Sequence, residues 1–101
     1  MRTRVFRYEF DRDVPMEEVE SSLLLSILAL ESLHGETDTQ LNAAHYFDPD
    51  KRTCVIDAGT EVGRDFNRLF AGFLRREFGR DQFSVRMAKR PLKAPPTGTD
   101  R

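Results

Sequence analysis

The segment from Cys54 to Phe78 most constrains the fold of this chain, because it joins a strand pattern, a glycine turn and a long amphipathic helix pattern. After the turn, the apolar residues follow the i, i+4, i+7, i+8 spacing of one helix face. They are Val62, Phe66, Leu69, Phe70, Phe73, Leu74 and Phe78. Each such side chain contributes roughly 1.5 to 3 kcal/mol when it is removed from water. The pattern therefore predicts a helix over about 61–78 that packs on a core and ends before Gly79.

The overall composition is that of one small domain without a strongly charged partner. The chain has 101 residues, of which 39% are hydrophobic, enough for a core. Its 16 basic and 17 acidic residues nearly cancel, which argues against nucleic acid and membrane surfaces as partners. A single cysteine excludes an internal disulfide. The charged residues 1–13 do not resemble a signal peptide. No apolar run reaches the roughly 20 residues that a membrane span needs. We therefore expect a cytoplasmic protein.

Periodicity and turn residues divide the chain into alternating strands and helices. Strict alternation predicts a strand over 5–10 with one buried side. Pro15 suits the first position of a helix, and Gly35 suits its C-terminal cap. The predicted elements, in order, are a strand over 5–10, a helix over 15–34, a strand from about 40 to 47, a hairpin strand that ends at Asp57, a helix over 61–78 and a strand over 83–88. The last strand is expected to point Phe83, Val85 and Met87 inward.

A turn over 48–51, with proline at its second position, joins the two middle strands into a hairpin. Closing the hairpin at this turn sets three pairs of residues opposite one another. These pairs are His45 with Cys54, Ala43 with Ile56, and Leu41 with Ala58.

The order βαββαβ is typical of the ferredoxin-like fold, an α+β two-layer sandwich. We expect a four-stranded antiparallel sheet in the strand order 4-1-3-2, with two helices on one face. Residues 1–90 form this single domain. The segment 91–101 has three prolines and few residues to bury, which predicts a disordered C-terminal tail.

The turn from Asp57 to Gly63 is a candidate anion site, because free N–H groups at a helix N-terminus attract phosphate or carboxylate. Glu61 in the first turn would repel an anion. The alternative is that Thr60 caps the helix and Gly59 serves a tight turn. The candidate ligand-binding residues are Asp57, Gly59, Thr60 and Gly63, together with Arg7 and Arg86 on the open sheet face.

Metal binding and RNA binding have less support in the sequence. His45 and Cys54, predicted to be neighbours, supply two ligands, whereas a zinc centre needs three or four. The open sheet face lacks the aromatic side chains on which RNA-binding domains of this architecture stack bases. Its charged residues, such as Arg7 with Asp57 and Glu9 with Arg86, are expected to form a lattice of surface ion pairs. No metal, cofactor or catalytic residue is predicted, and nucleic acid is not an expected partner.

The second half of the first helix is apolar nearly all round, although a two-layer fold buries only one side of it. Leu24, Leu25 and Leu28 lie opposite the core side, and an exposed apolar patch of this kind is typical of an interface. On the second helix, a basic stripe with a small-residue gap could join the interface. Its residues are Arg64, Arg68, Gly72 and Arg75. Alternatively, the loop before the second strand, or the tail, covers the leucines.

These features favour a non-enzymatic protein-interaction module that forms a homodimer through its first helix. The alternative is a small ligand-binding or catalytic domain that uses the open sheet face and the turn from Asp57 to Gly63.

Overall fold

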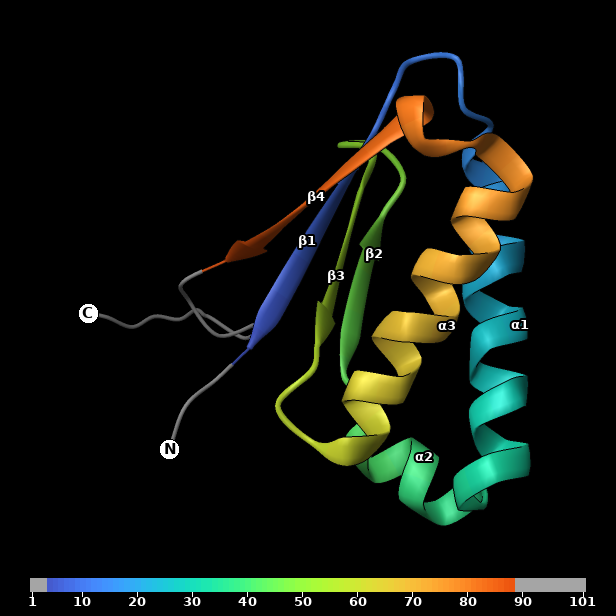
Figure 1. Cartoon of the computed structure of the whole chain (residues 1–101), viewed down its shortest axis with the longest axis vertical. Helices are drawn as coiled ribbons and strands as arrows, with labels where there is room; N and C mark the ends of the chain where they lie inside the picture. The colour runs from blue at the N-terminus through green and yellow to red at the C-terminus, as the bar shows by residue number, and fades with distance from the viewer. Residues whose placement is uncertain (1–3, 89–101) are drawn as a thin grey trace.

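The computed structural model describes residues 4–88 and contains four strands, three α-helices and one short 3-10 helix. In chain order (Figure 1) the elements are β1 (Val5–Phe10), α1 (Met16–His34), α2 (Glu36–Asn42), β2 (His45–Asp48), β3 (Thr53–Asp57), α3 (Glu61–Phe78), η1 (Arg80–Gln82) and β4 (Phe83–Ala88). The tail predicted over 91–101 lies outside the described residues.

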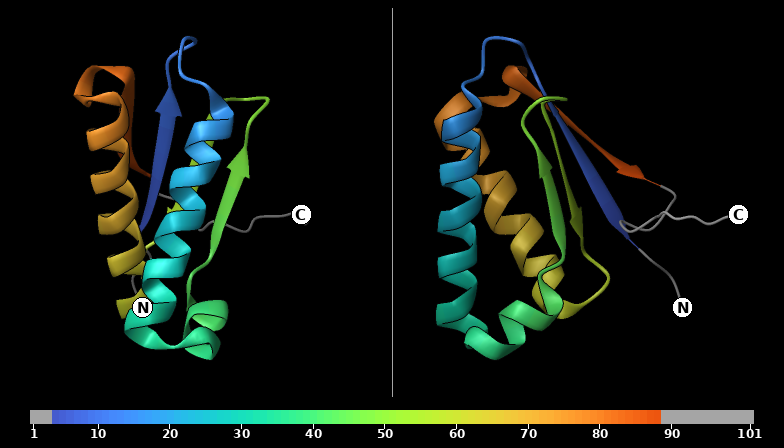
Figure 2. Two further views of the ribbon diagram at one scale, coloured as in Figure 1. Left: turned by 90° about the vertical axis from the view of Figure 1, so that its right-hand side faces the viewer. Right: turned by 180° about the vertical axis from the view of Figure 1, so that it is seen from behind.

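The four strands form one antiparallel sheet in the order β2-β3-β1-β4. This is the predicted order 4-1-3-2 counted from the other edge. Helices α1 and α3 lie side by side on one face of the sheet, and α2 lies at the end of this helical layer (Figures 1 and 2). The described chain is therefore an α+β structure in which a four-stranded antiparallel sheet is covered on one face by helices.

The core lies between the sheet and the helices and is centred on Tyr8 of β1 and on Phe66 and Phe70 of α3, all fully buried. The rings of Tyr8 and Phe70 meet edge to face with 4.9 Å between their centroids, a favoured aromatic geometry. The Tyr8 hydroxyl donates a hydrogen bond of 2.6 Å to Asn67 Oδ1. The one polar group that tyrosine brings into the core thus has a partner.

Capping residues place the helix ends close to the predicted positions. Thr60 precedes α3, and its Oγ1 accepts the N–H of Gly63 at 2.9 Å. Gly35 follows α1 with a φ of 88°, a conformation that glycine adopts at little cost because it has no Cβ. Helix α1 begins at Met16, one residue later than predicted, with Pro15 as its N-cap.

The strand predicted from about residue 40 is wrong in its first half, where the chain forms α2. The acidic residues Glu36 and Asp38 in the first turn of α2 suit the positive end of the helix dipole. Thr39 is buried, whereas Leu41, which the strand pattern assigned to the core, is 74% exposed. The short alternation that suggested a strand does not correspond to a sheet face, and β2 begins only at His45.

The β2–β3 hairpin is shifted by two residues from the predicted register. His45 lies opposite Ile56 rather than Cys54, and the other two predicted pairs fail because their first members precede β2. The turn closes one residue later than expected, since Arg52 adopts a left-handed φ of 58° and its N–H bonds to the carbonyl of Pro49 at 3.2 Å. A shift by two keeps each side chain on its predicted face and changes only its cross-strand neighbour.

The edge strand β4 swings away from the helices (Figures 1 and 2). Val85 and Met87 share the helix-facing side of the sheet, because they pair with Tyr8 and Phe6 of β1. They are nevertheless 42% and 57% exposed. The prediction that these two side chains join the core is wrong, because the helical layer does not extend over this edge.

Candidate interaction surface on the helical layer

The outer side of α1 carries three exposed leucines, termed the leucine surface: Leu24, Leu25 and Leu28. They are 54%, 52% and 59% exposed, because α1 packs on the core through its opposite side. Leu24 and Leu28 are one helical turn apart and therefore adjacent. Of the two covers considered for this surface, the segment before β2 folds into α2 and leaves the leucines exposed, and the tail over 91–101 lies outside the described residues.

Negative charge borders the leucine surface. Helix α1 contains no lysine or arginine and has four glutamates, namely Glu17, Glu18, Glu20 and Glu31. Glu20 lines a hollow beside Phe47 of β2, and Glu31 lines another beside His45. Both of these glutamates therefore lie on the β2 side of α1.

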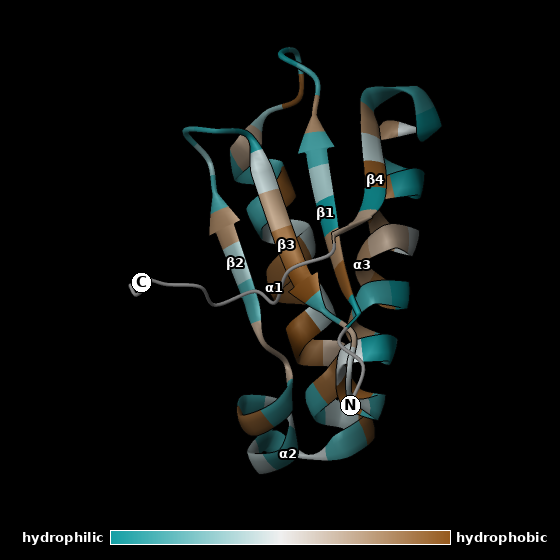
Figure 3. Cartoon of the chain, turned by 90° about the vertical axis from the view of Figure 1, so that its left-hand side faces the viewer, coloured by the Kyte–Doolittle hydropathy of each residue, from teal (hydrophilic) through white to brown (hydrophobic). Residues whose placement is uncertain are grey.

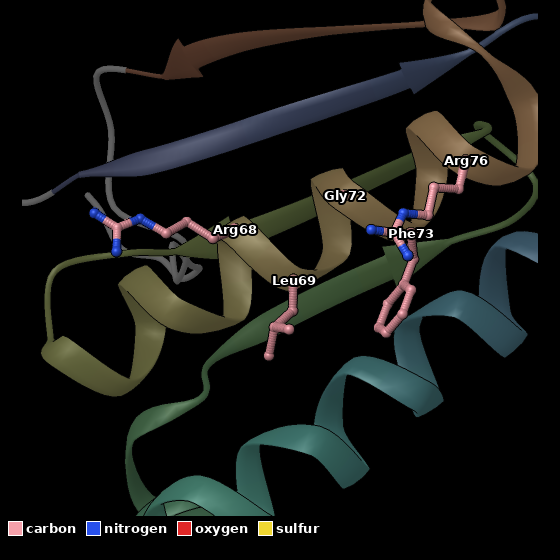
Figure 4. Close-up of a pocket in the computed structure, with 5 residues that line it drawn as sticks. All are labelled: Arg68, Leu69, Gly72, Phe73 and Arg76. Atoms are coloured by element: carbon pink, nitrogen blue, oxygen red, sulfur yellow. The ribbon is translucent and has the colours of Figure 1, made fainter.

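The outer side of α3 is basic, and a surface hollow lies near the middle of the helix. Arg64, Arg68 and Arg75, predicted to form one stripe, are all exposed. Next to this stripe is a hollow of about 210 Å³, shown in Figure 4. Its lining residues are Arg68, Leu69, Gly72, Phe73 and Arg76. The hollow thus combines apolar side chains with two cationic ones.

Two side chains give the hollow an apolar wall: Leu69 and Phe73 point toward α1 (Figure 4). Arg76 belongs to the same hollow, although the sequence analysis did not name it. The available signal was its spacing, since a residue four positions after Gly72 lies on the same helix face.

Among the described residues, no contact explains why Gly72 is a glycine. A Cβ at this position would meet no atom within 4 Å, and the backbone is ordinary helix. Glycine in a helix interior costs about 1 kcal/mol relative to alanine. The described chain therefore accepts this cost without using the space that glycine leaves.

The candidate anion turn is occupied by its own side chains. Asp57 Oδ1 accepts the N–H of Gly59 at 2.9 Å, and Thr60 Oγ1 accepts that of Gly63. The Thr60 hydroxyl also donates to the carbonyl of Asn42 at 3.1 Å. A Cβ on Gly63 would lie 2.2 Å from the carbonyl oxygen of Asp57. Gly63 thus permits a close approach of α3 to the end of β3, and the turn has the capping role that was the alternative interpretation.

The open sheet face, seen in Figure 3, carries a small group of surface ion pairs. Arg7 Nε lies 2.9 Å and Arg86 Nη2 3.4 Å from the same oxygen, Glu9 Oε2. The hydrogen bond from Arg7, with a smaller contribution from Arg86, holds the pKa of Glu9 below its usual value. Arg7 pairs with Glu9 where a pair with Asp57 was predicted. Exposed pairs of this kind contribute at most about 1 kcal/mol.

Arginines also surround a second hollow, beside the turn from Asp57 to Gly63. This hollow measures about 160 Å³ and is lined by Arg4, Phe6, Ala58, Arg64, Asn67 and Arg68. No carboxylate is among its lining residues. Sequence reasoning missed it because Arg4 precedes β1 while the other two arginines belong to α3, and only the fold brings them together.

His45 and Cys54 are not opposite each other in the hairpin, since Cys54 pairs with Phe47 and His45 with Ile56. The His45 ring packs edge to face on Phe66, with 5.3 Å between centroids, and its Nδ1 lies 3.0 Å from the carbonyl of Ala43. Cys54 is fully buried, and burial raises the pKa of its thiol to about 12. Because the thiolate is the nucleophilic and metal-binding form, Cys54 behaves as a small apolar side chain.

Within residues 4–88, no cluster of three or more histidine, cysteine or acidic side chains is arranged to hold a metal ion. None of the helices in the same range has the length and apolar character needed to cross a membrane. Comparison of the chain with protein-family models, with curated proteins and with solved structures gives no match.

Proposed function

We propose that this chain is a non-enzymatic interaction module that forms homodimers through the outer surface of its helical layer. The observation that carries the proposal is the leucine surface, in which Leu24, Leu25 and Leu28 are each more than half exposed. Contiguous apolar surface on a small domain is typical of an interaction site. The proposal includes a ferredoxin-like classification, with α2 as an added helix, and a cytoplasmic location, where a lone cysteine such as Cys54 stays reduced.

The leucines alone do not account for a stable dimer. Full burial of one leucine contributes roughly 1.5 to 3 kcal/mol, so the exposed half of each contributes about 1 kcal/mol. A symmetric dimer would bury six of them, for about 6 kcal/mol, whereas association costs an estimated 4 to 15 kcal/mol. Additional surface must take part, and the basic stripe with its hollow on α3 is adjacent to α1 in the same layer.

Sedimentation velocity at micromolar concentrations tests the proposal. The wild-type chain is expected to sediment as a dimer, and the variant Leu24→Glu/Leu28→Glu as a monomer. The matched control is Leu41→Glu/Met87→Glu, which introduces the same two charges at exposed apolar positions outside the leucine surface and is expected to remain dimeric. A monomeric wild type at these concentrations would contradict self-association.

A second candidate function, binding of a small anion, has one observation in its favour. Arg4, Arg64 and Arg68 line the hollow of about 160 Å³ beside the turn from Asp57 to Gly63. This volume is below the roughly 300 to 1,000 Å³ of typical small-molecule sites, which places this function second. Calorimetric titration with inorganic phosphate, for the wild type and for Arg64→Ala, tests it. Heat of binding in the wild type that is lost in the variant would favour this alternative, and no heat in either would exclude phosphate.

A further inference from the structure

We propose that α1 of each copy packs against α3 of the other, around a two-fold axis that runs parallel to the helices. In this arrangement the leucine surface of one copy covers the hollow at Gly72 of its partner. The inference rests on the proposed self-association and adds the geometry of the dimer, which the exposed leucines by themselves do not determine.

Two helical layers can face each other around a two-fold axis in two ways. An axis across the helices places α1 on α1 and α3 on α3, whereas an axis parallel to them places α1 on α3 twice. Helix α1 has four glutamates and no basic residue except His34. Helix α3 presents a row of exposed arginines, namely Arg64, Arg68, Arg75 and Arg76. Helix α3 also carries Glu61, Asp65 and Glu77, and Asp65 lies 3.8 Å from Arg68, so its four arginines leave a net charge of +1 against −4 for α1. Since like charges opposite each other are unfavourable, the parallel axis, which sets the acidic α1 opposite the arginines of α3, is favoured over an axis that sets α1 on α1.

The contact between His34 and Asp65 fixes how the two helices are aligned within one protomer. Its Nε2–Oδ2 distance is 2.9 Å, and the helices run in opposite directions (Figure 1). Equal steps of about 1.5 Å per residue from this contact place Glu31 level with Arg68. A two-fold axis parallel to the helices preserves these levels. Glu31 of one copy is therefore level with Arg68 of the other.

The same alignment places the leucine surface over the hollow of α3. Leu28 is level with Ala71, next to Gly72, and Leu25 is level with Leu74, so the two leucines bracket the hollow. Its volume of about 210 Å³ is several times the roughly 30 Å³ share of a water molecule, which is enough room for a leucine side chain. Because no atom of residues 4–88 occupies the space beside Gly72, a partner side chain gives this glycine a role.

The size of the helical layer is sufficient for a dimer interface. Helices of 19 and 18 residues are each about 27 Å long. Two such helices packed about 10 Å apart present an outer surface roughly 20 Å wide, or about 540 Å² in projection. Accessible area exceeds projected area, so the layer approaches the roughly 800 Å² that each partner contributes to a standard interface.

Charge reversal distinguishes the two arrangements. One variant carries Glu20→Arg and Glu31→Arg on α1, a second carries Arg68→Glu and Arg75→Glu on α3, and a third carries all four changes. In the proposed arrangement Glu31 is level with Arg68, and Glu20 lies about one helical turn from the level of Arg75. Each of the first two variants therefore places like charges near each other across the interface, and its dimer Kd is expected to rise at least about tenfold. The third variant restores opposite charges across the interface and is expected to return to within about threefold of the wild-type Kd.

The outcomes separate this inference from the proposed function. The matched control combines the α1 reversal with Arg12→Glu and Lys51→Glu, which restores net charge outside the helical layer and is expected to leave the dimer weak. If the third variant, with all four changes, dimerises as weakly as this control while the wild type dimerises, the proposed arrangement is wrong but self-association stands. A wild-type chain that is monomeric at all accessible concentrations overturns both.

A second variant tests the hollow independently of charge. Gly72→Leu fills it with a side chain whose Cβ meets no atom of the described residues, so the circular dichroism spectrum and cooperative unfolding are expected to be preserved. The dimer Kd is expected to rise at least tenfold, because the partner leucines lose their site. A folded Gly72→Leu variant that dimerises like the wild type would overturn the inference.

Discussion

Replacing Gly72 by alanine is expected to stabilise the folded protomer by about 1 kcal/mol, the difference in helix propensity between the two residues. The structure supports the full value for two reasons. The backbone at Gly72 is helical without a positive φ, and no atom lies within 4 Å of the position that a Cβ would take. For a domain of this size, this stabilisation corresponds to an increase of roughly 4 to 8 °C in Tm.

The same substitution at Gly63, earlier in α3, is expected to have the opposite effect. Its Cβ would lie 2.2 Å from the carbonyl oxygen of Asp57 and 3.2 Å from the Cα of Ala58. Both atoms belong to the backbone, which cannot rotate aside as a side chain can. Forcing extra volume into such a site typically costs about 1 to 3 kcal/mol, which exceeds the gain in propensity. The two variants thus compare the same Gly→Ala change at a site with no close backbone neighbour (Gly72) and at one with such a neighbour (Gly63).

Urea unfolding followed by far-ultraviolet circular dichroism measures both effects. The measurement is made in a Leu24→Glu/Leu28→Glu background, so that dissociation of a dimer does not contribute to the free energy of unfolding. A Gly72→Ala variant that is less stable than its parent would show that the protomer itself uses the space beside Gly72. A partner side chain would then not be what fills the hollow.

Three further substitutions test other parts of the structure. Tyr8→Phe is expected to lower the free energy of unfolding by about 1 to 2 kcal/mol in urea titrations, because Asn67 Oδ1 loses the donor that lies 2.6 Å away; an unchanged stability would mean that this bond is absent. Burial raises the pKa of the Cys54 thiol from 9.0 to about 12. The free energy of unfolding is therefore expected to fall as the pH rises from 9 toward 12. In Cys54→Ala this pH-dependent loss, measured in the same urea titrations, is expected to be smaller. Glu9→Gln is expected to cost less than about 1 kcal/mol at pH 7. Because Arg7 holds the pKa of Glu9 below its usual value, this difference from wild type should shrink as the pH falls through the lowered pKa of the folded protein; a difference that does not change with pH would exclude this origin.

The leucine surface and the principal elements could be predicted from sequence because they depend on local patterns. The 3.6-residue spacing of apolar side chains specified α1 and α3, and strict alternation specified β1. Thr60 and Gly35 marked helix ends, since a cap acts on backbone groups within a few residues. The exposure of Leu24 followed from the same periodicity, because a helix that is apolar on all sides has more apolar surface than one sheet can cover.

The second helix and the hairpin register were decided by tertiary structure. Over a few residues, apolar spacing fits a short helix as well as a strand, and Leu41 therefore suggested a sheet face that does not exist. The hydroxyl of Thr60 donates to the carbonyl of Asn42, the last residue of α2, and this contact forms only once α3 is in place. The register depended on the left-handed conformation of Arg52, which no local pattern indicated.

The details of the candidate surface also came only from the fold. Exposure of Met87 follows from the divergence of β4 from the helical layer, and sheet twist accumulates over all strands rather than within one. The grouping of Arg4 with Arg64 and Arg68 of α3 depends on the relative placement of segments that are far apart in the chain. Periodicity determines which side of an element is buried, whereas the relative placement of the elements determines which exposed side chains share a site.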